Sequence, residues 1–234
     1  MSGATSDVDK LTNVLNRLLK EHAPAKRMPE NALRDIEPAC ALLVYSFLLW
    51  ESTPKHAAAG IKQLGDSIID LNDLRVAMPA EIVEITSMRD GLALERTERL
   101  RATLNDIYRR EHIVTLARLE SISKREVRDY LDGLEGMPSF VAARMTLLGF
   151  GGHAVPLDAR LKKMLTSEGV FQSGTPMGEA ESWLERQIRA TDAVDIALLL
   201  EGWRNKDRQP TPKKDAEEPQ GSTIQRDGPS KKDA

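Results

Sequence analysis

The residues that could do chemistry gather in one segment, residues 134–161. It reads Leu-Glu-Gly-Met-Pro-Ser-Phe-Val-Ala-Ala-Arg-Met-Thr-Leu-Leu-Gly-Phe-Gly-Gly-His-Ala-Val-Pro-Leu-Asp-Ala-Arg-Leu. The segment contains a glycine turn at Gly136, an apolar stretch, a glycine-rich loop and one carboxylate, Asp158. An ionised carboxylate can stabilise developing positive charge or help to orient and deprotonate water. The pattern therefore indicates anion binding at the turn and catalysis at the aspartate.

Short helices are expected on both sides of the turn. Ser123 and Glu126 have the spacing of a capping box, so a helix should begin near residue 124. Gly133 and Gly136 can adopt the positive φ values of a tight reversal, and Pro138 suits the first position of a second helix. The unpaired N–H groups at the start of that helix form a site for an anion such as a DNA phosphate. A helix pair that binds no ligand is the alternative.

Asp158 has two interpretations. It directly precedes Ala159-Arg160-Leu161-Lys162-Lys163-Met164-Leu165, and aspartate is a favoured helix N-cap. It could also act on a sugar, because breaking an N-glycosidic bond develops positive charge that a carboxylate stabilises. The base would first have to be flipped out of the DNA stack. One residue can serve both purposes.

Taken together, the hairpin and the aspartate resemble the helix-hairpin-helix, Gly/Pro-Asp superfamily of DNA glycosylases. Residues 134–142, Leu-Glu-Gly-Met-Pro-Ser-Phe-Val-Ala, overlay the Leu-Pro-Gly-Val-Gly-Arg-Lys-Thr-Ala hairpin of endonuclease III-like members without a gap, and Asp158 follows at the matching distance. The resemblance implies an all-α, bilobal fold over roughly residues 28–205 and double-stranded DNA as the partner. It also implies that Gly136, Met137 and Ser139 bind a phosphate and that Asp158 is the catalytic carboxylate.

Three departures from the family pattern narrow the implied activity. Phe140 occupies the position of the family's Schiff-base lysine and cannot form an imine. Pro138 replaces the second glycine and lacks an N–H for a phosphate. Cys40 is the only cysteine, so the four-cysteine iron–sulfur cluster of many members cannot form.

The activity that these departures leave is monofunctional: hydrolysis of the N-glycosidic bond of a damaged or mispaired base without strand cleavage. The main alternative is a degenerate member that binds DNA or a protein partner without catalysis. A third possibility is a helical scaffold in which the motif match is fortuitous.

Three further residues are candidates for the pocket or for DNA contact. Glu51 lies one turn after Phe47, which aligns with the glutamate of adenine-type members, and a solvated helix-end glutamate is its alternative. Arg144 lies in the second helix of the hairpin. His153 lies in the glycine-rich loop, where a surface histidine is the alternative.

The composition of the whole chain fits a helical protein. Its 234 residues are 41% hydrophobic with helical periodicity, and the apolar stretch at residues 39–50 is too short to span a bilayer. Four scattered histidines and one cysteine lack metal-ligand spacing, and no dinucleotide or phosphate-loop motif is present, so neither metal nor cofactor is expected. A net charge of −3 is unusual for a strong nonspecific DNA binder, so any positive field must be local to the hairpin and the aspartate. The single cysteine and the lack of a secretory signal pattern predict a cytoplasmic protein, associated with the nucleoid if it binds DNA.

Three segments are predicted along the chain. Residues 1–24 form an amphipathic N-terminal helix that docks on the core, and residues 25–205 form a glycosylase-like domain of two helical lobes. Residues 206–234 form a polar tail that buries too little apolar surface to become ordered. Within the domain, further helices are expected over residues 35–51, 55–64, 82–88 and 96–111, and near 178–189 and 193–203.

Overall fold

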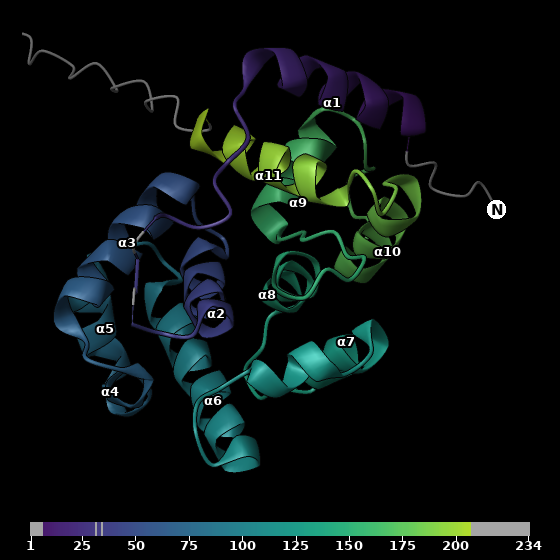
Figure 1. Cartoon of the computed structure of the whole chain (residues 1–234). Helices are drawn as coiled ribbons and strands as arrows, with labels where there is room; N and C mark the ends of the chain where they lie inside the picture. Colours follow the sequence, from purple (N-terminus) through teal and green to yellow (C-terminus); the bar gives the residue numbers. More distant parts are fainter. Residues whose placement is uncertain (1–6, 31, 34, 207–234) are drawn as a thin grey trace, which may run out of the picture.

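The computed structural model describes residues 7–30, 32, 33 and 35–206, which form helices and loops without a β-strand. Apart from residue 206, the predicted polar tail lies outside the described residues. In the described ranges no helix is both long and apolar enough to cross a bilayer. The helices form two groups on either side of a central helix, α8 (Ser139–Arg144) (Figure 1).

The first group consists of α2 (Pro38–Leu49), α3 (Pro54–Ser67), α4 (Leu71–Val76), α5 (Pro79–Thr86) and α6 (Ala93–Glu111). A proline at the first position starts α2, α3 and α5, where its missing N–H costs no helical hydrogen bond. Every residue of α2 from Cys40 to Leu49 is buried, as its continuous apolar sequence predicts. Helix α4 was not expected from the sequence; it is short and is capped by the carboxylate of Asp70.

The second group consists of α1 (Val8–Glu21), α7 (Lys124–Asp132), α9 (Ala159–Ser167), α10 (Met177–Gln187) and α11 (Ala193–Trp203). Helix α1 lies against α11 and buries Leu11, Val14 and Leu18 (Figure 1). Two 3₁₀ turns, η1 (Ala117–Ser121) and η3 (Arg204–Lys206), precede α7 and follow α11 respectively.

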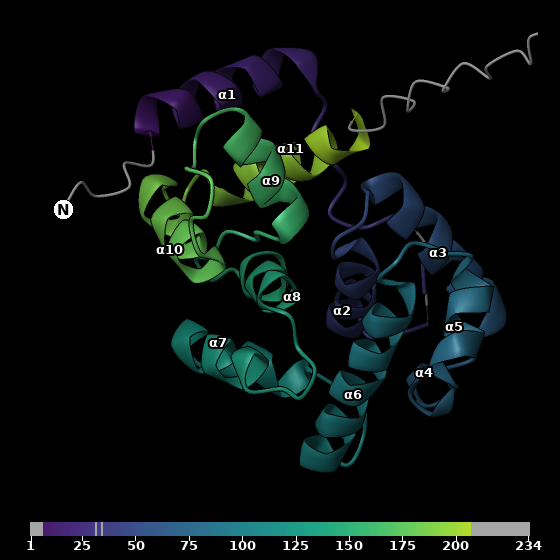
Figure 2. The same cartoon turned by 180° about the vertical axis from the view of Figure 1, so that it is seen from behind.

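Helix α8 joins the two groups. It continues directly into a π-helical turn, η2 (Met145–Gly149), and this continuous rod contacts α2, α7 and α11. Both views show α8 between the two groups (Figures 1 and 2). The sequence predicted one regular helix here, beginning at Pro138; instead Pro138 is the N-cap and the last turn is π-helical. Gly133 also differs from expectation, because its φ is −85° and only Gly136 of the two glycines is left-handed, at φ 78°.

Candidate functional site

Asp158 is the N-cap of α9. Its Oδ1 accepts a hydrogen bond from the Leu161 amide at 2.9 Å, which confirms the cap predicted from the sequence. Its Oδ2 accepts from the Glu51 amide at 2.8 Å and forms an ion pair with Arg204. The side chains of Asp158 and Arg204 are both 0% exposed. In this conformation the aspartate is therefore fully buried, with every oxygen engaged.

Glu51 reciprocates from the loop between α2 and α3. Its Oε1 accepts from the Ala159 amide at 2.6 Å, and its Oε2 accepts from the Arg160 amide at 3.0 Å. The two side chains thus satisfy the first amides of α9 together, and we call Glu51 and Asp158 the carboxylate pair. The solvated alternative for Glu51 is wrong, because the residue is half-buried and bonded to α9.

The carboxylate pair is electrostatically asymmetric. Burial, and next the nearby charge of Asp158, raise the pKa of Glu51 above its ordinary value, and the α9 amides oppose this shift only in part. Arg204 in turn supplies a positive charge to Asp158. Glu51 therefore retains its proton to a higher pH than an ordinary glutamate. Its backbone also stands at φ 54°, a left-handed conformation that non-glycine residues seldom adopt and that often marks functional positions.

Arg204 is the site residue that sequence reasoning missed. It lies in η3, far along the chain from Asp158, and its guanidinium stands 4.9 Å from the centre of the Phe140 ring. Phe140, in α8, aligns with the Schiff-base lysine of the endonuclease III-like hairpin. In this protein the cation beside Asp158 is instead Arg204, which comes from η3. Nε and Nη1 of Arg204 are buried without a hydrogen-bond partner. No local pattern around residue 204 signals this contact, because only the packing of α11 brings it to α9.

Arg144 is also buried, which contradicts its predicted contact with DNA. Its side chain is 0% exposed and its Nε donates to Glu201 Oε1 at 2.7 Å. Its Nη1 donates to Ser46 Oγ at 2.9 Å, and its Nη2 donates to the Arg27 carbonyl at 2.7 Å. The cause is the central place of α8, whose Arg144 side points between α2 and α11. Arg144 ties α8 to α2 and α11.

The hairpin between α7 and α8 forms as predicted, but its polar groups are largely occupied. Gly136 packs on α6 so closely that a Cβ would stand 2.7 Å from the Arg99 carbonyl oxygen. The Met137 amide donates to the Leu134 carbonyl at 3.2 Å, closing the turn. The exposed Ser139 hydroxyl donates to Glu181 at 2.7 Å. A phosphate at this hairpin would therefore have to displace a carboxylate from Ser139 and could not use the Met137 amide.

Charges of both signs lie beside the hairpin: Arg109 and Arg110 bond to Glu135 and to the Gly133 carbonyl, and a group of carboxylates lies near Ser139. Burial raises the pKa of Glu181 and of Asp132, which share this surface with Glu185. Arg128 is neutralised by Glu185 at 3.0 Å and by Asp132 at 3.7 Å. The exposed His153 bonds through Nε2 to the Glu185 carbonyl at 2.9 Å, so it lies near the hairpin and away from the carboxylate pair.

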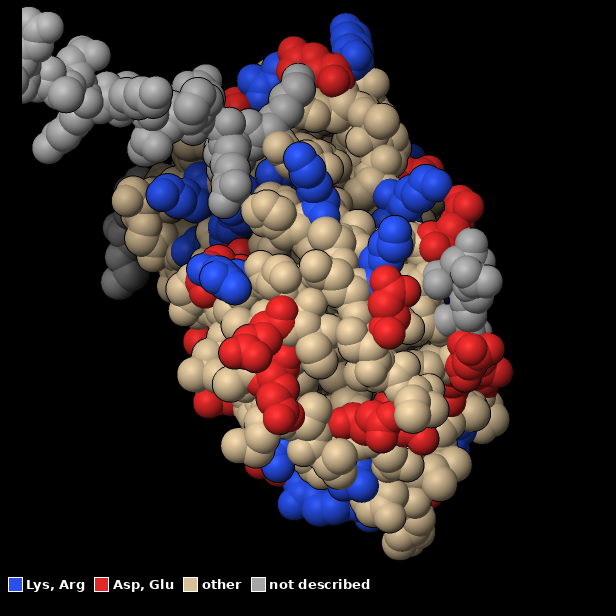
Figure 3. Space-filling model, turned by 90° about the vertical axis from the view of Figure 1, so that its left-hand side faces the viewer, with Lys and Arg blue, Asp and Glu red and all other residues tan. Residues whose placement is uncertain are grey.

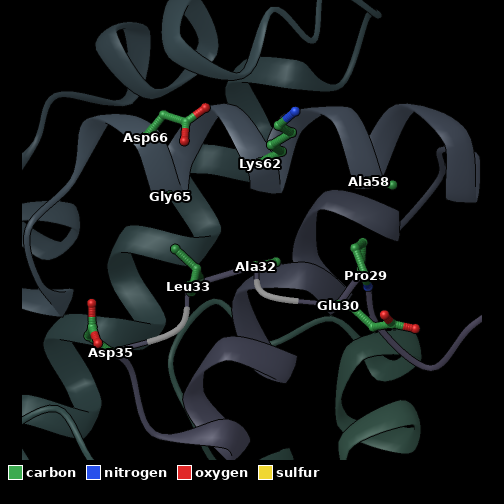
Figure 4. A pocket seen from close by; sticks show the side chains of 9 residues that line it. All are labelled: Pro29, Glu30, Ala32, Leu33, Asp35, Ala58, Lys62, Gly65 and Asp66. Carbon is green, nitrogen blue, oxygen red and sulfur yellow. The ribbon is translucent and has the colours of Figure 1, made fainter.

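Two depressions of the described surface lie elsewhere. One of about 410 Å³ lies between α3 and the segment that includes Pro29 and Leu33; among the described residues it is lined by the acidic Glu30, Asp35 and Asp66 and by one cation, Lys62 (Figure 4). Another of about 360 Å³, between α3 and the end of α5, is lined by residues that include His56, Gln63 and Arg89. The face formed by α3, α4 and α5 carries mixed charges, with acidic side chains across its middle and basic ones above and below (Figure 3). In the described part of the chain, neither depression is lined by a residue of the carboxylate pair.

The described residues contain no cluster of three or more His, Cys, Asp or Glu side chains suited to hold a metal ion.

Comparison with known proteins gives a consistent answer at the level of structure. No protein-family model and no curated protein sequence matches this chain. A trapped endonuclease III–DNA covalent intermediate is similar with a TM-score of 0.62 at 14% identity, covering 84% of this chain and 85% of that one. A non-covalent endonuclease III–DNA complex gives a TM-score of 0.60 at 14% identity, with the same coverage of 84% and 85%. Clostridium acetobutylicum 8-oxoguanine glycosylase/lyase, in complex with double-stranded DNA that contains cytosine opposite 8-oxoguanine, gives 0.54 at 14% identity, covering 85% of this chain and 70% of that one.

Each of these solved structures covers about 84–85% of this chain. The order of elements, the Gly136 turn and the capping Asp158 are the features that the sequence resemblance emphasised. The chain therefore has the all-α fold of the helix-hairpin-helix DNA glycosylases.

Proposed function

We propose that this protein hydrolyses the N-glycosidic bond of a damaged or mispaired base in duplex DNA, without cleaving the strand. The observation that carries the proposal is the convergence of Glu51 and Asp158 on the N-terminus of α9. Two carboxylates in different environments are what such a hydrolysis needs: one that holds a proton for the leaving base and one that stays ionised.

The roles follow from their surroundings. Glu51, with its raised pKa and half-buried side chain, would donate a proton to the base as the bond between the base nitrogen and C1′ breaks, and the bonding electrons leave with the base. Asp158 would stabilise the positive charge on the sugar. A water oxygen would then bond to C1′, and its proton would pass to the Glu51 carboxylate, which regains the proton that it gave to the base. Phe140 cannot form an imine with the sugar, so hydrolysis would be the whole reaction.

A second candidate function is DNA binding without catalysis. A specific observation favours it: the Asp158 side chain is fully buried and ion-paired, so no sugar reaches it in this conformation. The carboxylates beside the hairpin would weaken such binding by repelling the phosphates, and the remaining attraction, from Lys and Arg, would be sensitive to salt.

One experiment separates the two functions. Purified protein is incubated in excess over duplexes that carry uracil, alkylated purines, oxidised bases or adenine opposite oxidised guanine, with and without a later alkali step. Base hydrolysis predicts strand breaks only after alkali, loss of these breaks with Asp158→Asn, and a rate reduced at least tenfold with Glu51→Gln. Each variant is assayed at a temperature at which its circular dichroism is that of the folded protein. A wild-type protein that releases no base from any duplex, yet shifts a labelled duplex in a salt-dependent way, would replace hydrolysis with the second function.

A further inference from the structure

The last described turn of the chain, η3, places Arg204 against the buried side chain of Asp158. We propose that η3 is a releasable latch: in the resting protein Arg204 covers Asp158, and η3 withdraws to let a substrate sugar reach the carboxylate. This inference rests on the proposed function and adds a regulatory step to the same site.

Among the described residues, η3 is held by side-chain contacts of Arg204 and Asn205, and the Arg204 guanidinium also lies 4.9 Å from the centre of the Phe140 ring. Besides the Arg204–Asp158 ion pair, Asn205 Oδ1 accepts from the Lys55 amide at 3.2 Å, and Arg160 Nη2 donates to the Arg204 carbonyl at 3.4 Å. Both hydrogen bonds are at the long end of the normal range and are correspondingly weak. The turn is three residues long and is covalently continuous only with α11 on its described side. Among the described elements, withdrawal of η3 bends the chain only at the end of α11.

Arg204 itself is incompletely satisfied in the closed state. Its Nε and Nη1 are buried with no partner, and buried donors without acceptors are unfavourable compared with donors in water. Withdrawal of η3 would hydrate both atoms. The free energy gained by this hydration offsets part of the free energy lost when the ion pair breaks. The closed state is therefore less strongly favoured over the open state than the burial of Arg204 suggests.

The carboxylate pair would survive the release. Asp158 keeps the Leu161 and Glu51 amides as donors, and Glu51 keeps the Ala159 and Arg160 amides, because none of these bonds involves η3. The N-terminus of α9 thus stays capped. What changes is that Asp158 loses its counterion and gains access to solvent and substrate.

Asn205→Ala tests the latch without changing the carboxylate pair or Arg204. The variant removes one contact of η3, and loss of a single hydrogen bond of this kind shifts an equilibrium by about fivefold. Asn105→Ala is the matched control, because Asn105 also accepts through its side chain, from Arg75 at 3.0 Å, but lies on α6 away from η3.

The first readout is hydrogen exchange of arginine Nε–H groups by NMR, which needs no activity. We expect the Nε–H of Arg204 to exchange about fivefold faster in Asn205→Ala than in wild type. The Nε–H of Arg144, equally buried in its own ion pair, should be unchanged. Equal Arg204 rates in wild type, Asn205→Ala and the control would overturn the latch.

The second readout is the single-turnover rate of base release. A latch predicts a rise of about fivefold in Asn205→Ala and none in Asn105→Ala. An active wild type whose rate does not rise in Asn205→Ala would leave the proposed function standing and refute the latch. Accelerated Arg204 exchange without base release by any protein would retain the movement of η3 and refute the hydrolysis.

Discussion

Replacement of Asp158 by asparagine should destabilise the protein strongly, although asparagine is itself a good N-cap. The aspartate uses Oδ1 for the Leu161 amide and Oδ2 for the Glu51 amide and Arg204. Asparagine has only one side-chain oxygen. If that oxygen faces Leu161, the NH₂ group faces two donors, and with η3 in its closed position Arg204 becomes a buried cation without a counterion.

The magnitude follows from that loss. Removing one partner of a buried ion pair costs about 3–5 kcal/mol in the free energy of unfolding. For a protein of this size each kcal/mol lowers Tm by about 2–4 °C, so Tm should fall by roughly 6–20 °C. The cap contributes little to this change, because asparagine and aspartate are similar N-caps.

A double-mutant cycle with Arg204→Met isolates the pair. Urea unfolding, followed by circular dichroism at neutral pH, should give a coupling energy of about 2–3 kcal/mol between residues 158 and 204. The control cycle uses Arg17 and Glu168, a partly exposed pair at 2.6 Å, and should give no more than about 1 kcal/mol. A coupling as small as that of the surface pair, or an Asp158→Asn variant as stable as wild type, would refute the buried ion pair. An aspartate already open to solvent in the resting protein would give that result.

Three other predictions concern the hairpin. Because the pKa of Glu181 is raised, its carboxylate becomes neutral at a higher pH than an ordinary glutamate. DNA affinity, measured by fluorescence anisotropy, should therefore rise as the pH decreases through that pKa, and Glu181→Gln should bind DNA more tightly at pH 7 with a flatter pH profile. The same pH dependence of affinity in both proteins would exclude a role for this carboxylate. Gly136→Ala should lower the free energy of unfolding by at least about 1 kcal/mol more than Gly151→Ala. Both glycines have a positive φ, but only at Gly136 would a Cβ collide with backbone. Equal decreases in the free energy of unfolding would contradict that packing. Phe140→Lys should lower the free energy of unfolding by about 3 kcal/mol or more, because it buries a second cation near Arg204. Borohydride should trap no covalent adduct of this variant with duplex DNA; a trapped adduct would mean that the lysine reaches the sugar.

Local signals in the sequence were sufficient for most of the helices. The Ser123–Glu126 capping box starts α7, Asp158 caps α9, and the apolar run after Pro38 is the buried α2. Each of these features depends on residues within a few positions of one another, where short-range hydrogen bonding and periodicity decide the conformation. The π-helical turn η2 was not predicted, because its wider winding leaves no distinct trace in an apolar sequence.

The sequence by itself determined which groups the candidate site contains: a turn glycine, an N-capping aspartate, a phenylalanine where the family has lysine, and a glutamate at the end of the apolar helix. Only the tertiary structure decided how they are used. Glu51 and Asp158 meet because the loop after α2 lies against the start of α9, and Arg204 neutralises Asp158 because α11 ends beside it. Charge pairing between distant segments depends on burial and on which helices are neighbours, and neither is encoded in the spacing of residues along the chain.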